Sequence, residues 1–220
     1  MSKKKSVLDK RTIVNLFNEN KFSKISKYSK SIIDYYETDI DICKLVIASE
    51  INLKNYFKAE QYLQKIIIIH NTDELNYLYG NILKIQDKFY EAVDAYKKAI
   101  LLNNKFSEAY NNLANTQKKI NENENAMHNY IKAIKSDNSN LGAYFNLANL
   151  YRSEKKYDDA IKNYQKVLEL NPKFVESINS IGTINLILGN FENGLKYFKK
   201  TIEIDKFYSE SYYNYVLAKN

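Results

Sequence analysis

The sequence is poor in the residues that bend or end secondary structure, with five glycines and one proline in 220 residues. A β-sandwich or an α/β enzyme needs many tight turns, and glycine and proline occupy a large share of such turns. Their scarcity argues against both classes and favours helices joined by short connections. Hydrophobic residues make up 45% of the chain, which is ample for a folded core.

Cysteine and long apolar segments are also scarce. Cys43 is the only cysteine, so the chain cannot form an internal disulfide, which suits a reducing compartment. No apolar stretch of signal-peptide length follows the lysine-rich N-terminus. The run Ile66 to Ile69 is the longest made only of isoleucine, leucine or valine, and it is far too short to cross a bilayer. We therefore expect a soluble protein of the cytoplasm.

The positive charge is concentrated at one end of the chain. Residues 1–30 contain nine basic and two acidic side chains, and this excess equals the whole net charge of +7. The remaining 190 residues carry 24 basic and 24 acidic side chains. We interpret residues 1–30 as a basic arm in contact with solvent. Contact of this arm with an anionic membrane or with nucleic acid is the alternative.

Small residues recur with a period of 34 along the chain. Several series with the same period indicate an array of repeated supersecondary units, each of which buries its apolar face against its neighbours. Tyrosines at 96, 130 and 164 follow the same period. The two small-residue series are Ala92, Ala126, Ala160, Gly194 and Gly80, Ala114, Ala148, Gly182.

Residues 141–174 show the repeated unit most clearly. Apolar side chains from Tyr144 to Tyr151 follow the spacing of one helix face. A second amphipathic helix runs from Tyr157 to Leu168 and ends before Pro172. The small residues fall where these two helices cross, so that the backbones can approach closely.

The sequence thus predicts an all-α fold, an α-α superhelical solenoid of about six helix pairs in one elongated domain. Residues 1–38 form the basic arm and a degenerate pair, and residues 209–220 form the unpaired first helix of a further repeat or cap. The expected repeat array, residues 39–208, consists of units 39–72, 73–106, 107–140, 141–174 and 175–208.

These residues resemble the tetratricopeptide repeat family. The resemblance covers roughly residues 39–220 and implies a helical solenoid that binds proteins and catalyses nothing. Other units lack the proline of the family pattern, and Asn76 and Ile178 stand where the pattern has a bulky residue. Unit 141–174 matches the pattern through Tyr144, Leu147, Ala148, Tyr151, Ala160, Tyr164 and Pro172, with Val167 in place of an alanine.

Motifs that carry catalysis are absent from the sequence. It has no glycine-rich phosphate loop, metalloprotease helix or nucleophile elbow. His70 and His128 lie more than one repeat apart, and together with Cys43 they do not suggest a metal site. The acidic pair Asp39 and Asp41 resembles a metal-binding motif of sugar-nucleotide transferases, but its place at a repeat boundary favours helix capping. We expect no catalytic residue, no metal and no cofactor.

Tetratricopeptide proteins bind ligands on the concave surface, which the first helix of each pair lines. The segments 110–115 and 144–149 resemble the superhelical repeats of O-linked N-acetylglucosamine transferase, where an asparagine ladder holds an extended peptide. This resemblance implies such a role for Asn112 and Asn146. Alternatively, the asparagines form hydrogen bonds between neighbouring helices. The expected groove residues are Tyr77, Asn81, Asn112, Asn115, Lys118, Phe145, Asn146, Asn149 and Arg152.

We therefore predict a non-catalytic scaffold or adaptor that binds an extended peptide or a partner protein in its concave groove. In the alternative, the repeats recruit substrates for a larger glycosyltransferase or sulfotransferase whose catalytic domain lies beyond residue 220. The final helix motivates this alternative, because Tyr212, Tyr215 and Val216 form an apolar face with no partner in the sequence.

Overall fold

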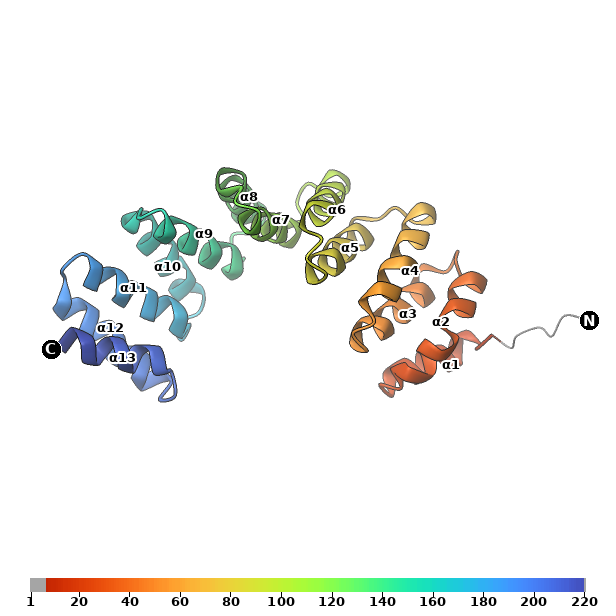
Figure 1. The fold of residues 1–220 in the computed structure, drawn as a ribbon, viewed down its shortest axis with the longest axis horizontal. Coiled ribbons are helices and arrows are strands. Elements are labelled where there is room, and N and C mark those ends of the chain that lie inside the picture. Colours follow the sequence, from red (N-terminus) through yellow and green to blue (C-terminus); the bar gives the residue numbers. More distant parts are fainter. Residues whose placement is uncertain (1–6, 220) are drawn as a thin grey trace, which may run out of the picture. The chain divides into compact units, whose positions relative to one another are not determined.

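The computed structural model describes residues 7–219, which form thirteen helices and no strand (Figure 1). This confirms the predicted all-α fold. The first six helices are α1 (Lys10–Asn18), α2 (Phe22–Tyr35), α3 (Ile40–Asn52), α4 (Tyr56–Ile69), α5 (Asp73–Ile85) and α6 (Phe89–Leu102). The others are α7 (Ser107–Lys119), α8 (Asn123–Ser136), α9 (Leu141–Ser153), α10 (Tyr157–Leu170), α11 (Val175–Ile187), α12 (Phe191–Ile204) and α13 (Ser209–Lys219).

The helices belong to two compact units. The first unit, Met1–Asn104, holds α1 to α6, and the second, Lys105–Asn220, holds α7 to α13. Within each unit the two helices of a pair pack on each other, and each pair packs on the next in chain order. This succession of stacked helix pairs is the solenoid that the 34-residue period predicts.

The same turn closes the first helix of each pair from α3 to α11. One residue of the turn has a positive φ, between 58° and 78°, and the next N–H donates to a carbonyl near the helix end. In the turn after α9, for example, Lys155 has φ 60° and the N–H of Lys156 donates to the Tyr151 carbonyl over 2.9 Å. Such a left-handed residue satisfies the last carbonyls of a helix and reverses the chain. Only Gly189 among these residues is a glycine, which explains how a glycine-poor chain turns so often.

The small residues of the repeat lie at the crossing of the paired helices. Ala148 of α9 and Ala160 of α10 are fully buried and share a cluster with the ring of Tyr164. In the first unit, a Cβ atom added to Gly80 would lie 2.6 Å from the ring of Tyr96. The aromatic ring therefore fills the space that the small residue leaves, and a larger residue does not fit without movement.

Leucine in place of Ala160 should overpack this crossing. We expect Ala160→Leu to lower the free energy of unfolding by about 1–3 kcal/mol, because the added carbons meet a filled core. Urea denaturation followed by circular dichroism measures the change. Lys162→Leu, at an exposed position of the same helix, is the matched control and should change stability little. Equal stability of Ala160→Leu and the wild-type chain would contradict the placement of Ala160.

A buried carboxyl group joins three helices of the first unit. Glu50 of α3 is 0% exposed. Both of its oxygens accept a hydrogen bond from the Ser26 hydroxyl of α2 over 3.0 Å, and Oε2 also accepts one from Nδ2 of Asn55 over 2.8 Å. Asn55 is the N-cap of α4. Glu50 therefore ties α2 and α3 to the start of α4, and its polar atoms are satisfied without a cation.

The predicted basic arm lies only partly within the described residues. Lys3, Lys4 and Lys5 fall outside them, whereas residues 10–30 contribute to α1 and α2. Ile13 and Ile25 of these helices are fully buried. Of the helices within residues 7–219, none has both the length and the apolar character needed to cross a membrane.

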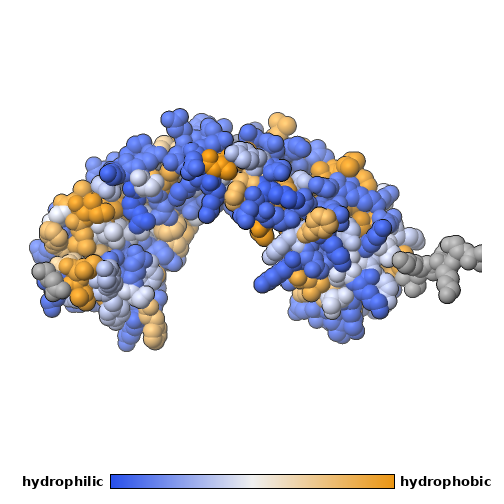
Figure 2. All heavy atoms as spheres, viewed as in Figure 1, coloured by the Kyte–Doolittle hydropathy of each residue, from blue (hydrophilic) through white to orange (hydrophobic). Residues whose placement is uncertain are grey.

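Hydrophobic residues gather beside the C-terminal end of α13, as Figure 2 shows. Tyr212 and Val216 are 44% and 56% exposed, and Tyr215 is half-buried. The apolar face that the sequence places on this last helix is thus largely open to solvent among the described residues.

Candidate functional site

The second unit contains a pocket of about 500 Å³ on the first helices of its repeats. Consecutive repeats supply its walls, from the end of α7 to the start of α13. It is lined by Lys118, Phe145, Asn149, Arg152, Ser153, Glu176, Asn179, Ser180, Tyr208 and Glu210.

Four of the nine predicted groove residues line this pocket: Lys118, Phe145, Asn149 and Arg152. Three others belong to the same helices but are not among its lining residues, namely Asn112 and Asn115 of α7 and Asn146 of α9. The remaining two, Tyr77 and Asn81, lie on α5 in the first unit.

The sequence prediction missed most of the far wall of the pocket. Glu176 and Ser180 belong to α11, Tyr208 immediately precedes α13, and Glu210 belongs to α13. A signal was present, since Glu176 and Glu210 are 34 residues apart, as are Phe174 and Tyr208. Periodicity identifies such pairs as equivalent, but it does not tell which neighbouring repeats share one pocket.

Phe145 gives the pocket an apolar floor. Its ring lies 5.1 Å from that of Phe174 and 5.9 Å from that of Tyr164, measured between centroids. Both contacts have the inclined geometry that aromatic pairs favour. The ring is thus held by core residues on one side and reaches the pocket on the other.

Asn149 is positioned by a buried tyrosine. The hydroxyl of Tyr164, a fully buried side chain, donates to Oδ1 of Asn149 over 2.6 Å. Burial raises the pKa of Tyr164, so the hydroxyl keeps its proton. This bond fixes the orientation of the amide, whose Nδ2 can donate to a ligand.

The same bond recurs in two other repeats. Tyr130 donates to Asn115 and Tyr96 donates to Asn81, each over 2.7 Å and across 15 residues of sequence. Two other repeats have no tyrosine at the equivalent position, and they have no asparagine at its partner position either. The corresponding pairs are Thr183 with Phe198 and Ala48 with Leu63.

Asn146 makes a bond of a different kind. Its Nδ2 donates to Oδ1 of Asn111, one repeat earlier, over 3.0 Å. This bond connects α9 with α7 across the face that carries the predicted groove residues. For Asn146, this is a hydrogen bond between neighbouring helices of the kind that the alternative interpretation describes.

Two cations, Lys118 and Arg152, line the pocket, and both are half-buried. Burial lowers the pKa of Lys118, and the charges of Arg152 and Lys119 lower it further. Within residues 7–219, no carboxylate lies within 4.0 Å of either cation. Arg152 instead donates a long hydrogen bond, 3.4 Å, to the Ser180 hydroxyl.

Removal of the Arg152 charge should raise the pKa of Lys118. The reason is that a neighbouring positive charge disfavours the protonated amine. We expect the Lys118 side-chain resonances of Arg152→Gln to titrate at higher pH than those of the wild-type chain, in an NMR pH series. Lys155→Gln removes a nearby exposed charge and serves as the control. An unchanged titration in Arg152→Gln would show that the two charges do not interact.

Two carboxylates, Glu176 and Glu210, also line the pocket. Burial and the carboxylates of Glu210 and Glu176 raise the pKa of Tyr208 to about 12. The Tyr208 hydroxyl donates to Oε2 of Glu210 over 3.4 Å. The pocket therefore has cations on its α7 and α9 side and carboxylates on its α11 and α13 side.

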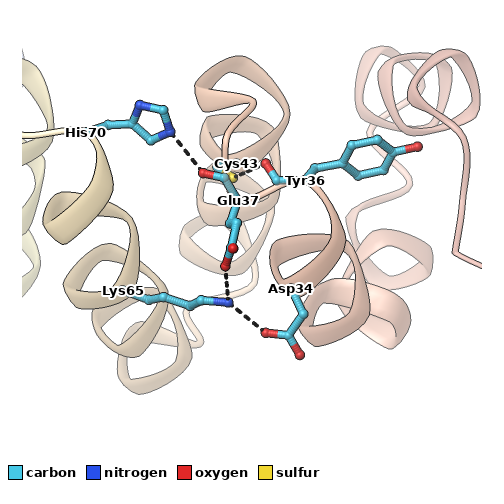
Figure 3. Close-up of polar contacts among 6 residues, drawn as sticks. All are labelled: Asp34, Tyr36, Glu37, Cys43, Lys65 and His70. Atoms are coloured by element: carbon cyan, nitrogen blue, oxygen red, sulfur yellow. Dashed lines mark hydrogen bonds and ion pairs between the residues drawn. The ribbon is translucent and has the colours of Figure 1, made fainter.

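Residues with reactive side chains in the first unit have structural roles (Figure 3). The Cys43 thiol donates to the Tyr36 carbonyl over 3.2 Å, and burial together with nearby carboxylates raises its pKa to about 11. Nε2 of His70 contacts the Glu37 carbonyl at 2.9 Å, and Lys65 bridges the carboxylates of Asp34 and Glu37. These contacts hold α2, α3 and α4 together.

The acidic pair at residues 39 and 41 is a capping site, as predicted. Asp39 is the N-cap of α3 and accepts a hydrogen bond from the N–H of Ile42 over 3.2 Å. A hydrogen bond from Lys10, aided by that of Ile42, lowers the pKa of Asp39. In the described part of the chain, no group of three or more His, Cys, Asp or Glu side chains is arranged to hold a metal ion.

Comparison with known proteins relates the chain to tetratricopeptide proteins. Family models described as "Tetratricopeptide repeat" match residues 142–174 and residues 73–106, 107–140 and 175–208, which together exceed half of the chain. Among curated proteins, none matches the sequence.

Several solved structures share the fold. A crystal structure of MamA is 24% identical with a TM-score of 0.69, and the match covers 73% of this chain and 95% of that one. YrrB, described as a TPR protein with an unusual peptide-binding site, is 18% identical with a TM-score of 0.66, over 87% and 96% of the two chains. The PilF protein of Pseudomonas aeruginosa is 12% identical with a TM-score of 0.75, over 96% and 95%.

Proposed function

Because the chain belongs to the tetratricopeptide repeat family, whose repeats typically mediate protein–protein interaction, we propose that it is a non-catalytic scaffold. It binds an extended segment of a partner protein against the first helices of its repeats. The pocket of the second unit is the centre of this interaction.

The composition of this pocket is the observation that carries the proposal. It combines an exposed part of an aromatic ring, Phe145, with amide groups, Asn149 and Asn179, and with charged side chains. Peptide ligands need this combination, because apolar side chains require an anchor and backbone groups require hydrogen-bond partners. Its volume of about 500 Å³ is within the range of ligand sites and accommodates a few side chains.

The surrounding asparagines extend the proposed groove. Asn112 and Asn146 lie on α7 and α9, and an amide side chain can pair with peptide groups whatever the peptide sequence. Asn115 completes the set in the second unit. In the first unit, Tyr77 and Asn81 occupy the equivalent sequence positions on α5 and are proposed to bind in the same way.

The comparisons agree with this role in outline. YrrB, whose fold is similar, is described as having a peptide-binding site. No observation supports the alternative in which the repeats serve a glycosyltransferase or sulfotransferase.

Selection of short random peptides on the full chain, followed by calorimetry, tests the proposal. We expect selected peptides to bind the wild-type chain and to lose about tenfold in affinity when Asn112→Ala and Asn146→Ala are combined. The loss follows from removal of two amides that pair with the peptide backbone.

Asn125→Ala combined with Asn163→Ala is the matched control, because these asparagines lie on the second helices α8 and α10. It should leave the affinity unchanged. Equal affinity of the groove variant and the wild-type chain, with an intact circular dichroism spectrum, would rule out the proposed groove.

A further inference from the structure

The two cations of the pocket differ from other lysines of the second unit. Lys156, for example, is paired with Glu154 at 2.7 Å and stands at the surface. Lys118 and Arg152 are half-buried beside each other, and among residues 7–219 neither has a carboxylate within pairing distance. Burial of charge without a partner is costly, and the mutual repulsion of the two cations adds to this cost.

The Asn149 amide adds a hydrogen-bond donor to the two cations. Its oxygen accepts a hydrogen bond from the Tyr164 hydroxyl, and its Nδ2 can donate to a ligand. The Ser180 hydroxyl accepts from Arg152 and also bonds to Tyr164, so it is already engaged within the protein. Lys118, Arg152 and Asn149 therefore present donors and positive charge to the pocket. The ligand that complements them is an anion with several acceptor sites.

We propose that the pocket binds a carboxylate side chain of the partner, an aspartate or glutamate, between Lys118 and Arg152. This inference rests on the proposed function, since it names the side chain that the groove selects. The carboxylate accepts hydrogen bonds from the ammonium and the guanidinium groups and from Nδ2 of Asn149. Its charge relieves the repulsion between the two cations.

The acidic wall limits the charge that the pocket accepts. Glu176 and Glu210 line the same pocket as the two cations, and both raise the pKa of Tyr208, another lining residue. A phosphate group with two negative charges is repelled more strongly by this wall than a carboxylate with one. A basic residue of the partner is favoured beside Glu176 and Glu210, next to the bound carboxylate.

Helix dipoles explain only part of this arrangement. Lys118 and Arg152 lie in the last turns of α7 and α9, and Glu176 and Glu210 in the first turns of α11 and α13. These signs suit the helix ends. A helix dipole, however, favours a cation at the helix C-terminus even when the cation is exposed to solvent. It therefore does not explain why these two cations are half-buried next to each other.

A pair of small peptides tests the proposal on the full-length chain. One is a capped alanine-based peptide that carries one glutamate followed by one lysine, and the other has glutamine in place of the glutamate. Binding is followed by NMR shifts of the ¹⁵N-labelled protein at peptide concentrations up to about 10 mM. We expect the glutamate peptide to bind about fivefold more tightly, with shifts at the Arg152 Nε–H group and the Asn149 side-chain amide.

Charge variants assign the effect to the pocket. Lys118→Gln combined with Arg152→Gln should bind both peptides equally. The control combines Lys119→Gln, at the end of α7, with Lys155→Gln, in the turn after α9, which removes two exposed charges and should keep the preference. A phosphoserine peptide should bind the wild-type chain no better than the glutamate peptide.

The outcomes separate this inference from the proposed function. Equal binding of the glutamate and glutamine peptides, with shifts in the pocket, would overturn the carboxylate site and leave the peptide groove standing. A preference that survives in the Lys118 and Arg152 double variant would also overturn it. If neither peptide shifts any pocket resonance, both the carboxylate site and the pocket as a peptide site are wrong.

Discussion

Replacement of Tyr164 by alanine is expected to lower the free energy of unfolding by about 3–5 kcal/mol. Tyr164 is fully buried between α9 and α10, where it packs on Ala148 and Ala160. The variant leaves a cavity the size of an aromatic ring and deprives Asn149 of its hydrogen bond. Urea denaturation measured by circular dichroism gives the change in stability.

Two substitutions separate the contributions to this effect. Tyr164→Phe keeps the ring and removes only the hydroxyl, so it should cost about 1 kcal/mol. Tyr213→Ala, at a side chain that is 66% exposed, should have little effect. A loss for Tyr164→Ala no greater than that for Tyr213→Ala would contradict the buried position of this ring.

In the first unit, Glu50→Ala is expected to cost about 3 kcal/mol. The substitution leaves the Ser26 hydroxyl and the Asn55 amide without their acceptor and opens a cavity between α2 and α3. Because these donors are part-buried, water only partly replaces the lost bonds. The same denaturation experiment measures the loss.

A double-mutant cycle tests the origin of this loss. Ser26→Ala alone should cost less than Glu50→Ala, and the combined variant should be more stable than the sum of the two losses implies. Glu91→Ala, an exposed glutamate of α6, is the control and should stay within about 0.5 kcal/mol of the wild-type chain. Strict additivity of the Ser26 and Glu50 effects would mean that the hydrogen bonds between these two residues contribute nothing to the free energy of unfolding.

The helix pairs of the fold could be predicted because each pair corresponds to one 34-residue period of the small residues. A small residue such as Ala148 recurs where two helices cross, and the spacing of the apolar positions indicates a helix on each side. The turns were less visible. Lys155 and Asp87 take a left-handed conformation that glycine usually supplies, and only the structure shows that the neighbouring helix ends hold them there.

The candidate site could be predicted only in part, for a geometric reason. The resemblance to tetratricopeptide repeats implies a binding role for Lys118, Phe145 and Arg152, and all three line the pocket. Tyr208 and Glu210 were not identified, because they reach the pocket from a neighbouring repeat whose orientation no sequence period encodes. The hydrogen bond from the Tyr164 hydroxyl to Asn149 could not be predicted either, because a spacing of 15 residues does not show which side chains meet.

That bond limits how such a surface can change. An asparagine such as Asn149 faces the pocket, yet its carbonyl completes the hydrogen bonding of a tyrosine in the core. A substitution of Asn149 that alters binding therefore leaves the Tyr164 hydroxyl without its acceptor, unless the tyrosine is replaced as well. The pair Thr183 and Phe198, at the equivalent positions, illustrates such a joint replacement. New binding preferences at these positions are reached by paired exchanges, one on the surface and one inside. A design library that varies the surface alone will be enriched in chains that no longer fold well.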